Sequence, residues 1–229
     1  MEKLRTALGN RLMTVARFVE DGERIADIGT DHAYLPVYLV TNGVCPTAVA
    51  SDIGEGPLRN AEKIVVKTGT QDRIRLIISD GLDGYGKDDA DVFVFAGMGG
   101  TLISELLDRA RWVRDGRYRF IFQPMSRSEE LIEYLIENGF ELTEERSCFE
   151  GGRCYIVFCA KYSGEKSEYR ECFPYVGLLP DERSESSAFY INRQYKLVEK
   201  RLRALEKSNK SFPEQKKLMI VLEQMKEYL

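Results

Sequence analysis

The sequence is poor in the residues that several protein classes require. It has one histidine, one tryptophan and five cysteines among 229 residues, and no two cysteines form a C-x-x-C pair. One histidine and no such pair do not make the ligand set of a zinc centre, so we expect no metal. Five unpaired cysteines are typical of idle thiols in a reducing compartment, which predicts a cytoplasmic protein.

Long apolar stretches are also missing. No run approaches the 18 apolar residues of a membrane span, and the N-terminus lacks the apolar core of a signal peptide. We therefore expect neither a membrane segment nor a signal peptide. A hydrophobic content of 43% is nevertheless high enough for a folded core.

Positive charge does not exceed negative charge overall, and it is unevenly placed. The formal net charge is −4, which at first argues against a nucleic-acid-binding protein. However, residues 183–229 hold 11 basic and 6 acidic residues, whereas residues 1–182 are net −9. Such an asymmetry suggests an anionic partner for the C-terminal part, or the charges only solvate a helical surface.

Short strand-like and helical segments alternate through residues 1–138. The hydrophobic patterns predict strands at 24–28, 47–53, 74–79, 91–96 and 119–123. They predict helices at 2–19, 33–41, 56–67, 101–112 and 127–138. This alternation is typical of a parallel sheet with right-handed crossovers, an α/β fold.

The pattern changes after residue 139. Residues 140–149 and 153–162 read as an antiparallel hairpin around Gly151-Gly152, and 163–182 lack periodicity and contain Gly and Pro, which suits a linker or docking loop. From residue 184 a heptad seam begins, and Ser211 with Glu214 fits a capping box for a second helix. The seam residues are Ile191, Tyr195, Val198, Leu202, Leu205, Leu218, Leu222, Met225 and Leu229. We therefore expect an α/β domain over 1–162, a linker over 163–182 and a coiled-coil helical hairpin over 183–229.

The first predicted strand runs into a glycine at the start of a helix, in Ala26-Asp27-Ile28-Gly29-Thr30-Asp31-His32-Ala33. This is the usual place for a nucleotide-like cofactor. A dinucleotide would need glycine at position 31, and the carboxylate of Asp31 would repel a pyrophosphate on this helix N-terminus. Asp27 and Asp31 instead favour a cationic cofactor. S-adenosylmethionine, with its sulfonium and ammonium groups, fits that requirement.

Further polar or glycine-rich positions follow the next strands. Asp52 is placed to accept hydrogen bonds from ribose hydroxyls, and Asp80 with Gly81 to contact an adenine. The run Ala96-Gly97-Met98-Gly99 brings backbone close to a bulky group, or forms a tight turn. Gln123 has a donor and an acceptor with which to read a base edge, or it caps the next helix.

Taken together, Asp27 to Pro36, the run Ala96 to Gly100, and Gln123-Pro124 resemble the bacterial tRNA adenine-N1 methyltransferases that act on adenine 22. The resemblance runs along the whole chain. It implies a Rossmann-like class I methyltransferase sheet with a coiled-coil tail that helps to grip tRNA. We expect no membrane partner, and the sequence shows no sign of an obligate protein partner. Met125 departs from the family pattern, in which we expect Asn.

The resemblance implies methyl transfer from S-adenosylmethionine to N1 of adenine 22, with S-adenosylhomocysteine as product. Asp31, His32 and Gln123 are candidates for positioning the reactants, although His32 equally suits a helix cap and Tyr34 equally suits the core or the target base. The candidate tRNA contacts are Tyr34, Arg109, Arg111, Arg193, Lys196, Lys200, Arg203 and Lys207. Two alternatives remain: a methyltransferase of another RNA, a protein or a small molecule, with the hairpin for dimerisation, or an inactive RNA-binding adaptor.

Overall fold

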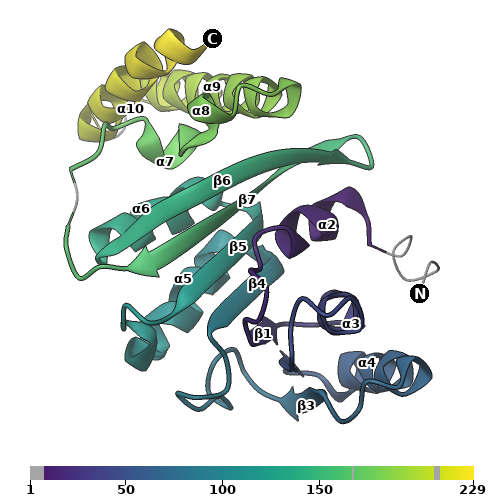
Figure 1. Cartoon of the computed structure of the whole chain (residues 1–229). Coiled ribbons are helices and arrows are strands. Elements are labelled where there is room, and N and C mark those ends of the chain that lie inside the picture. The colour runs from purple at the N-terminus through teal and green to yellow at the C-terminus, as the bar shows by residue number, and fades with distance from the viewer. Residues whose placement is uncertain (1–7, 167, 209–211) are drawn as a thin grey trace.

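A seven-stranded sheet forms the centre of the molecule, with strand order β3-β2-β1-β4-β5-β7-β6 (Figure 1). The computed structural model describes residues 8–166, 168–208 and 212–229. The strands are β1 (Ile25–Ile28), β2 (Ala48–Asp52), β3 (Ile74–Ile78), β4 (Val92–Gly99), β5 (Arg119–Ser126), β6 (Phe140–Glu150) and β7 (Arg153–Tyr162).

Strands β1 to β5 pair in parallel, whereas β7 runs antiparallel to both β5 and β6. The predicted fold class, a parallel sheet that ends in an antiparallel hairpin, is therefore confirmed. In such a sheet the carboxyl ends of neighbouring parallel strands share one edge, which is where α/β folds bind ligands.

Helices cover both faces of the sheet. In chain order they are α2 (Asn10–Ala16), α3 (Tyr34–Thr41), α4 (Glu55–Thr68), α5 (Gly100–Arg109), α6 (Ser128–Glu137), α7 (Phe173–Val176), α8 (Leu179–Glu182), α9 (Glu185–Ser208) and α10 (Phe212–Met225), with 3₁₀ turns at Arg111–Val113 and Lys226–Tyr228. Because side chains alternate across a strand, Val92 and Val94 of β4 pack with α2, α3 and α4, whereas Phe93 and Phe95 pack with α5 and α6.

Glycine allows α5 and α6 to start close together. A Cβ atom on Gly100 would lie 2.2 Å from the carbonyl oxygen of Arg127, the residue that precedes α6. Arg127 itself has a positive φ of 56°. The two helix starts are therefore held side by side at the carboxyl edge of the sheet.

The C-terminal helices α9 and α10 form the predicted helical hairpin, which lies along β6 and β7 (Figure 1). Val198, Leu202, Leu218 and Leu222 of the predicted seam are buried, but Leu229 is 56% exposed. Tyr190 and Gln194, which the heptad did not include, are also buried, because α9 packs on the sheet domain as well as on α10. Ser211 of the predicted capping box lies outside the described residues.

Segment 163–182, predicted as a linker or docking loop, contains the short helices α7 and α8. Cys172, Val176 and Leu179 are buried in one hydrophobic cluster with α5, α6 and the hairpin. The segment therefore joins the hairpin to the core of the sheet domain. The division of the chain at residues 162 and 182 stays a prediction.

A buried carboxyl fixes this segment to β6. Glu145 is 2% exposed and accepts a hydrogen bond of 2.7 Å from the backbone N–H of Leu178. Burial, with a smaller effect of Glu182, raises the pKa of Glu145 to about 8. Glycine is favoured at position 177, because a Cβ there would lie 2.0 Å from the Glu145 carboxyl and the φ of Gly177 is +52°.

Candidate functional site

Backbone hydrogen bonds tie together the loops that follow β1, β2 and β3. The N–H of Thr30 donates to the carbonyl of Ser51 at 2.7 Å, and the N–H of Ser79 donates to the carbonyl of Asp52 at 3.0 Å. The acidic residues that the sequence placed at three strand ends, Asp27, Asp52 and Asp80, thus lie along one edge of the sheet.

A cavity of about 370 Å³ opens at the end of β1. It brings together most of the residues predicted near the methionine end of a cofactor, with the predicted target-base residue Tyr34. Its lining is Arg11, Leu12, Asp27, Gly29, Thr30, Asp31, His32, Ala33, Tyr34, Leu35, Ala96 and Gly97. The other predicted cofactor residues, Asp52, Asp80, Gly81, Met98 and Gly99, lie outside this lining.

Asp27 is the buried acid of the cavity. Its residue is 7% exposed, and burial raises the pKa of its carboxyl to about 6, although a hydrogen bond with Thr30 and the charge of Arg11 act in the opposite direction. A carboxylate held away from water without a paired cation is stabilised by a cationic ligand. The residue type and its surroundings therefore fit the sulfonium and ammonium groups of S-adenosylmethionine.

Two glycines keep the cavity open. Gly29 has a φ of +77°, and a Cβ on it would lie 3.2 Å from the sulfur of Met98. Gly97 has a φ of +93°, and its Cβ would point toward the guanidinium of Arg11 at 3.7 Å. Any other residue at either position would both strain the backbone and fill the space.

Asp31, His32 and Tyr34 form a chain of contacts at the mouth of the cavity. His32 Nε2 lies 3.1 Å from Asp31 Oδ2, and their side chains are 37% and 69% exposed. The rings of His32 and Tyr34 stack with centroids 5.0 Å apart. These side chains are available to a ligand that enters from solvent.

Gln123 is placed differently from what a base-reading residue requires. It is fully buried, its Oε1 accepts a hydrogen bond from Arg11 Nη1, and its Nε2 donates to the carbonyl of Pro124 at 3.0 Å. Both ends of the amide are therefore occupied. Gln123 orients Arg11, and Arg11 is the side chain that faces the cavity.

Sequence reasoning missed Arg11. It stands on the polar side of the N-terminal helix, where no motif marks it, and only the docking of α2 on β6 and β7 brings it to the cavity. Its backbone N–H donates to Glu150 Oε2 at 3.0 Å, and its guanidinium lies 6.0 Å from the centre of the Tyr155 ring.

The predicted adenine contact Asp80 and the predicted tRNA contact Arg109 bind each other. Arg109 Nη1 donates to Asp80 Oδ2 at 2.9 Å, and this hydrogen bond lowers the pKa of Asp80. Arg111 lies 3.8 Å from Asp108. Neither arginine therefore offers an uncompensated charge to a phosphate.

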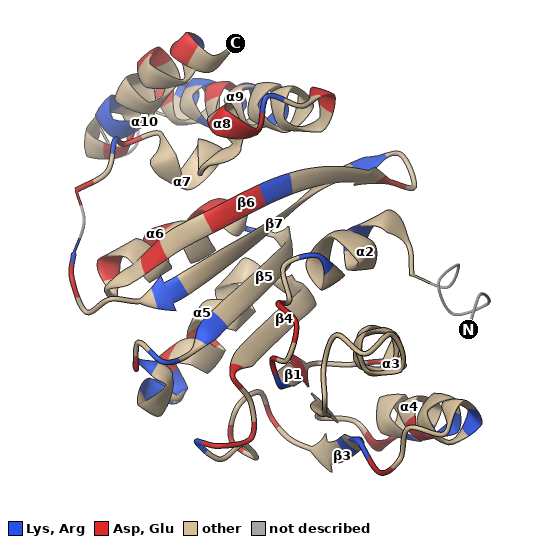
Figure 2. Ribbon diagram, viewed as in Figure 1, with Lys and Arg blue, Asp and Glu red and all other residues tan. Residues whose placement is uncertain are grey.

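The predicted tRNA-binding residues of the tail differ in whether a carboxylate pairs with them. Arg203 pairs with Glu199 at 2.9 Å, whereas the exposed Lys196, Lys200 and Lys207 have no ion pair with any described residue. Arg193 donates to the carbonyl of Cys154 rather than to a carboxylate. Figure 2 shows acidic and basic residues interspersed along α9 and α10, so the net positive charge depends on a few side chains.

No described helix has both the length and the apolar character needed to cross a membrane. No group of three or more His, Cys, Asp or Glu side chains in the described ranges is arranged to hold a metal ion.

Comparison with known proteins identifies the family. Residues 8–158 match the model of a methyltransferase domain. The tRNA (adenine(22)-N(1))-methyltransferase of Bacillus subtilis is 35% identical over 188 residues, 81% of this chain and 79% of the relative.

Solved structures agree with this match. The B. subtilis M1A22 tRNA methyltransferase TrmK is 29% identical and superimposes with a TM-score of 0.83 over 96% of this chain and 98% of its own. A putative tRNA (m1A22) methyltransferase of Streptococcus pneumoniae in complex with S-adenosyl-L-methionine is 30% identical, with a TM-score of 0.81 over 97% and 99% of the two chains. The chain therefore belongs to the family of bacterial tRNA (adenine(22)-N1)-methyltransferases.

Proposed function

We propose that this protein transfers the methyl group of S-adenosylmethionine to N1 of adenine 22 in tRNA. The observation that carries the proposal is the buried carboxyl of Asp27 in a glycine-lined cavity, at the strand edge where this fold binds ligands. Membership of the family supports the same reaction. The product of the cofactor is S-adenosylhomocysteine.

The acidic edge of the sheet holds the cofactor. Asp27, Gly29 and Asp31 bind its methionine end, with the backbone of Ala96 and Gly97 on the other side of the cavity. Asp52 accepts the ribose hydroxyls, and Asp80 with Gly81 contacts the adenine. Ile53, which follows Asp52 and is 70% exposed, offers an apolar surface for that ring. When bound, S-adenosylmethionine supplies the electrophilic methyl group.

The remaining residues of the cavity position the target base. N1 of neutral adenine already carries a lone pair, so the site has to align it rather than remove a proton. N1 lies on the base-pairing edge, and the base must leave its stacked position at a cost of a few kcal/mol. The half-buried stack of His32 and Tyr34 is placed to receive such a base, and Gln123 holds Arg11 in the same cavity.

The helical hairpin contributes to tRNA binding. Lys196, Lys200 and Lys207 are exposed and unpaired within the described ranges, so each can contact a phosphate. This assigns methyl transfer to residues 1–162 and RNA binding mainly to residues 183–229, with 163–182 between them. All five cysteines are free, which suits the reducing cytoplasm in which we place the protein.

Incubation of the protein with labelled S-adenosylmethionine and unmodified tRNA, followed by nucleoside analysis, tests the proposal. We expect labelled 1-methyladenine. Label in protein or in a small molecule but not in tRNA would favour a different methyltransferase. Failure to bind S-adenosylmethionine by calorimetry would favour an inactive RNA-binding adaptor.

A further inference from the structure

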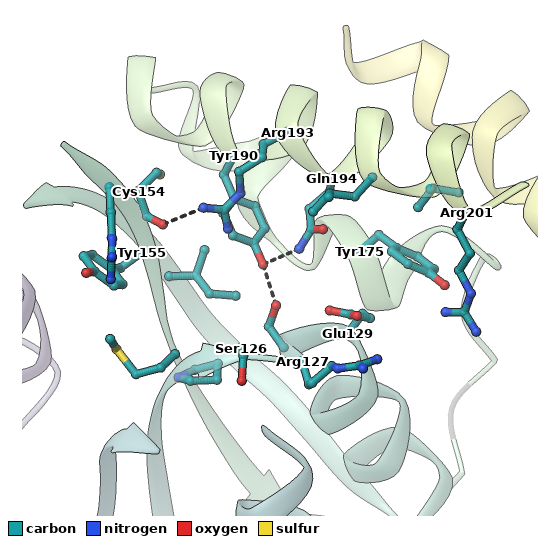
Figure 3. Close-up of a pocket in the computed structure, with 17 residues that line it drawn as sticks. Ser126, Arg127, Glu129, Cys154, Tyr155, Tyr175, Tyr190, Arg193, Gln194 and Arg201 are labelled. Carbon is teal, nitrogen blue, oxygen red and sulfur yellow. Dashed lines mark hydrogen bonds between the residues drawn. The ribbon is translucent and has the colours of Figure 1, made fainter. Parts of the chain in front are cut away.

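A second cavity, of about 440 Å³, lies between the sheet domain and the helical hairpin (Figure 3). Its walls come from the end of β5 and the start of α6, from the start of β7, from α7 and from α9. The volume falls within the range of pockets that hold small ligands. None of the residues assigned to the cofactor lines it.

One layer of side chains separates this cavity from the one beside Asp27. Met125 and Tyr155 line the second cavity, whereas Arg11 lines the first. The Arg11 guanidinium lies 6.0 Å from the centre of the Tyr155 ring, and buried Gln123 contacts both Arg11 and the sulfur of Met125. A ligand in the second cavity is therefore a close neighbour of a base bound at the first.

The second cavity is positively charged in a chain whose net charge is −4. Four arginines line it, Arg127, Arg153, Arg193 and Arg201, against a single acidic residue, Glu129. Arg127 pairs with Glu130 and Arg201 with Glu214. Arg153 and Arg193 have no carboxylate partner among the described residues, so their charges are available to an anion.

Arg193 is held in place without being neutralised. Its Nη1 donates to the carbonyl of Cys154 at 3.2 Å, and its guanidinium lies 5.0 Å from the centre of the Tyr190 ring (Figure 3). A guanidinium fixed on an aromatic face keeps further donors for a phosphate, and little side-chain entropy is lost on binding.

The opposite wall is the N-terminus of α6, a helix of ten residues. Ser126 and Arg127 line the cavity there and are exposed, and Arg127 has a positive φ of 56°. The first N–H groups of a helix favour a negatively charged ligand, and this adds to the effect of the arginines. Non-glycine residues in this backbone region are concentrated at functional sites.

The remaining lining suits a flat ring. Tyr175 is half-buried, and its hydroxyl makes no hydrogen bond with a described residue. Leu197 also lines the cavity and is 53% exposed. Ser128, Tyr190 and Gln194 form a fixed polar chain, with oxygen–oxygen and nitrogen–oxygen distances of 2.6 and 2.7 Å (Figure 3). An aromatic face, an amide and unpaired arginines together are the surroundings in which proteins bind an unstacked nucleotide.

We propose that the second cavity binds a nucleotide of the tRNA that directly neighbours the methylated adenine, with its phosphate on Arg153 and Arg193 and its base against Tyr175. This inference rests on the proposed function and adds a second nucleotide site to it. The hairpin then contributes to the recognition of the bases around the target, in addition to general phosphate binding.

The test measures methylation by the full chain of unmodified tRNA and of two tRNAs that are abasic immediately 5′ or 3′ of adenine 22. Arg193→Gln and Arg153→Gln are compared with Lys216→Gln, which removes the same charge from an exposed position of α10 outside the cavity. Each cavity variant should raise the KM for tRNA about tenfold, as expected for a lost charge-assisted hydrogen bond, and Lys216→Gln should stay within about twofold. The Kd for S-adenosylmethionine should not change in any of them. The midpoint of thermal unfolding should not change in Arg153→Gln, because the Arg153 side chain makes no hydrogen bond or ion pair with a described residue.

Tyr175→Leu tests the base contact, because it keeps apolar volume and removes the ring. The wild type should methylate one of the two abasic tRNAs about tenfold less efficiently than intact tRNA, the scale of one base–aromatic stack. Tyr175→Leu should lose about the same factor on intact tRNA and nothing more on that abasic tRNA.

The inference would be overturned if Arg193→Gln and Lys216→Gln changed the KM for tRNA equally. It would also be overturned if the loss caused by Tyr175→Leu and the loss caused by the abasic site multiplied when combined. In either case methylation of adenine 22 would still stand. Failure of the wild type to methylate intact tRNA would instead overturn the proposed function, and the inference with it.

Discussion

The binding of S-adenosylmethionine should weaken as the pH falls, because it depends on the charge of Asp27. Burial raises the pKa of this carboxyl to about 6 in the free protein. A cationic ligand binds to the ionised form, so binding lowers that pKa again. By linkage, affinity reaches its full value well above pH 6 and falls as the pH drops through the pKa of the free protein.

The size of the effect follows from the pKa. If the cofactor binds only to the ionised form, the observed Kd is the intrinsic Kd divided by the ionised fraction. With a pKa near 6, that fraction is about 0.9 at pH 7 and about 0.1 at pH 5. The Kd should therefore rise about tenfold between pH 7 and pH 5, or about 1.4 kcal/mol.

Calorimetric titration of S-adenosylmethionine at several pH values measures this effect. Asp27→Asn should bind more weakly at pH 7 and show no dependence on pH between 5 and 7. His32 lines the same cavity and is the one histidine of the sequence. His32→Gln is therefore the matched control and should keep the tenfold change. A flat profile for the wild type, or an unchanged slope in Asp27→Asn, would refute the reasoning.

Three further predictions concern the rest of the chain. The pKa of Glu145 is about 8 in the folded protein against an ordinary value of 4.5. The free energy of unfolding of the wild type should therefore fall by about 2 to 3 kcal/mol from pH 5 to pH 7 through this group. In denaturant titrations Glu145→Gln should lack that loss, and a pH profile identical to that of the wild type would contradict the assignment. Gly100→Ala places a Cβ 2.2 Å from the Arg127 carbonyl oxygen and should lower the free energy of unfolding by about 1 to 3 kcal/mol. Gly56→Ala in α4, where a Cβ meets nothing within 4 Å, should be neutral or stabilising. Equal denaturant midpoints for the two variants would count against the close packing of α5 and α6. Lys200→Gln and Lys207→Gln should each reduce the slope of log affinity for tRNA against log salt concentration by about one phosphate contact. Neither should change the Kd for S-adenosylmethionine. Filter binding at several salt concentrations measures the slope, and an unchanged slope would contradict the phosphate contact.

The parallel sheet could be predicted because the helices bury one face, which leaves a helical period in the sequence, whereas the central strands are buried on both faces, which leaves short apolar runs. The predicted strands at 74–79 and 91–96 correspond to β3 and β4, and the helix predicted at 127–138 to α6. The acids Asp27, Asp52 and Asp80 could be placed at one edge for the same reason, since the ends of neighbouring parallel strands meet there.

Contacts made by irregular backbone could not be predicted. The pairing of β6 with β7 shifts between Leu142 and Glu144, and this bulge turns Glu145 inward. Strict alternation from the buried Phe140 and Leu142 would have pointed Glu145 outward. Likewise Arg11 reaches the cavity only through the docking of α2, and Arg109 meets Asp80 through the packing of α5. The heptad seam predicted the pairing of α9 with α10 but not the second face of α9, where Tyr190 and Gln194 pack on the sheet domain.

The central claim, methylation of N1 at adenine 22, is tested most directly by primer extension on tRNA treated with the protein and S-adenosylmethionine. A methyl group on N1 blocks the base-pairing edge, so reverse transcription should stop opposite adenine 22. The stop should be absent when Asp27→Asn replaces the wild type at low cofactor concentration. When labelled S-adenosylmethionine is used, a tRNA with guanine at position 22 should take up no label. Stops at another adenine, or equal labelling of the guanine-22 tRNA, would contradict the account.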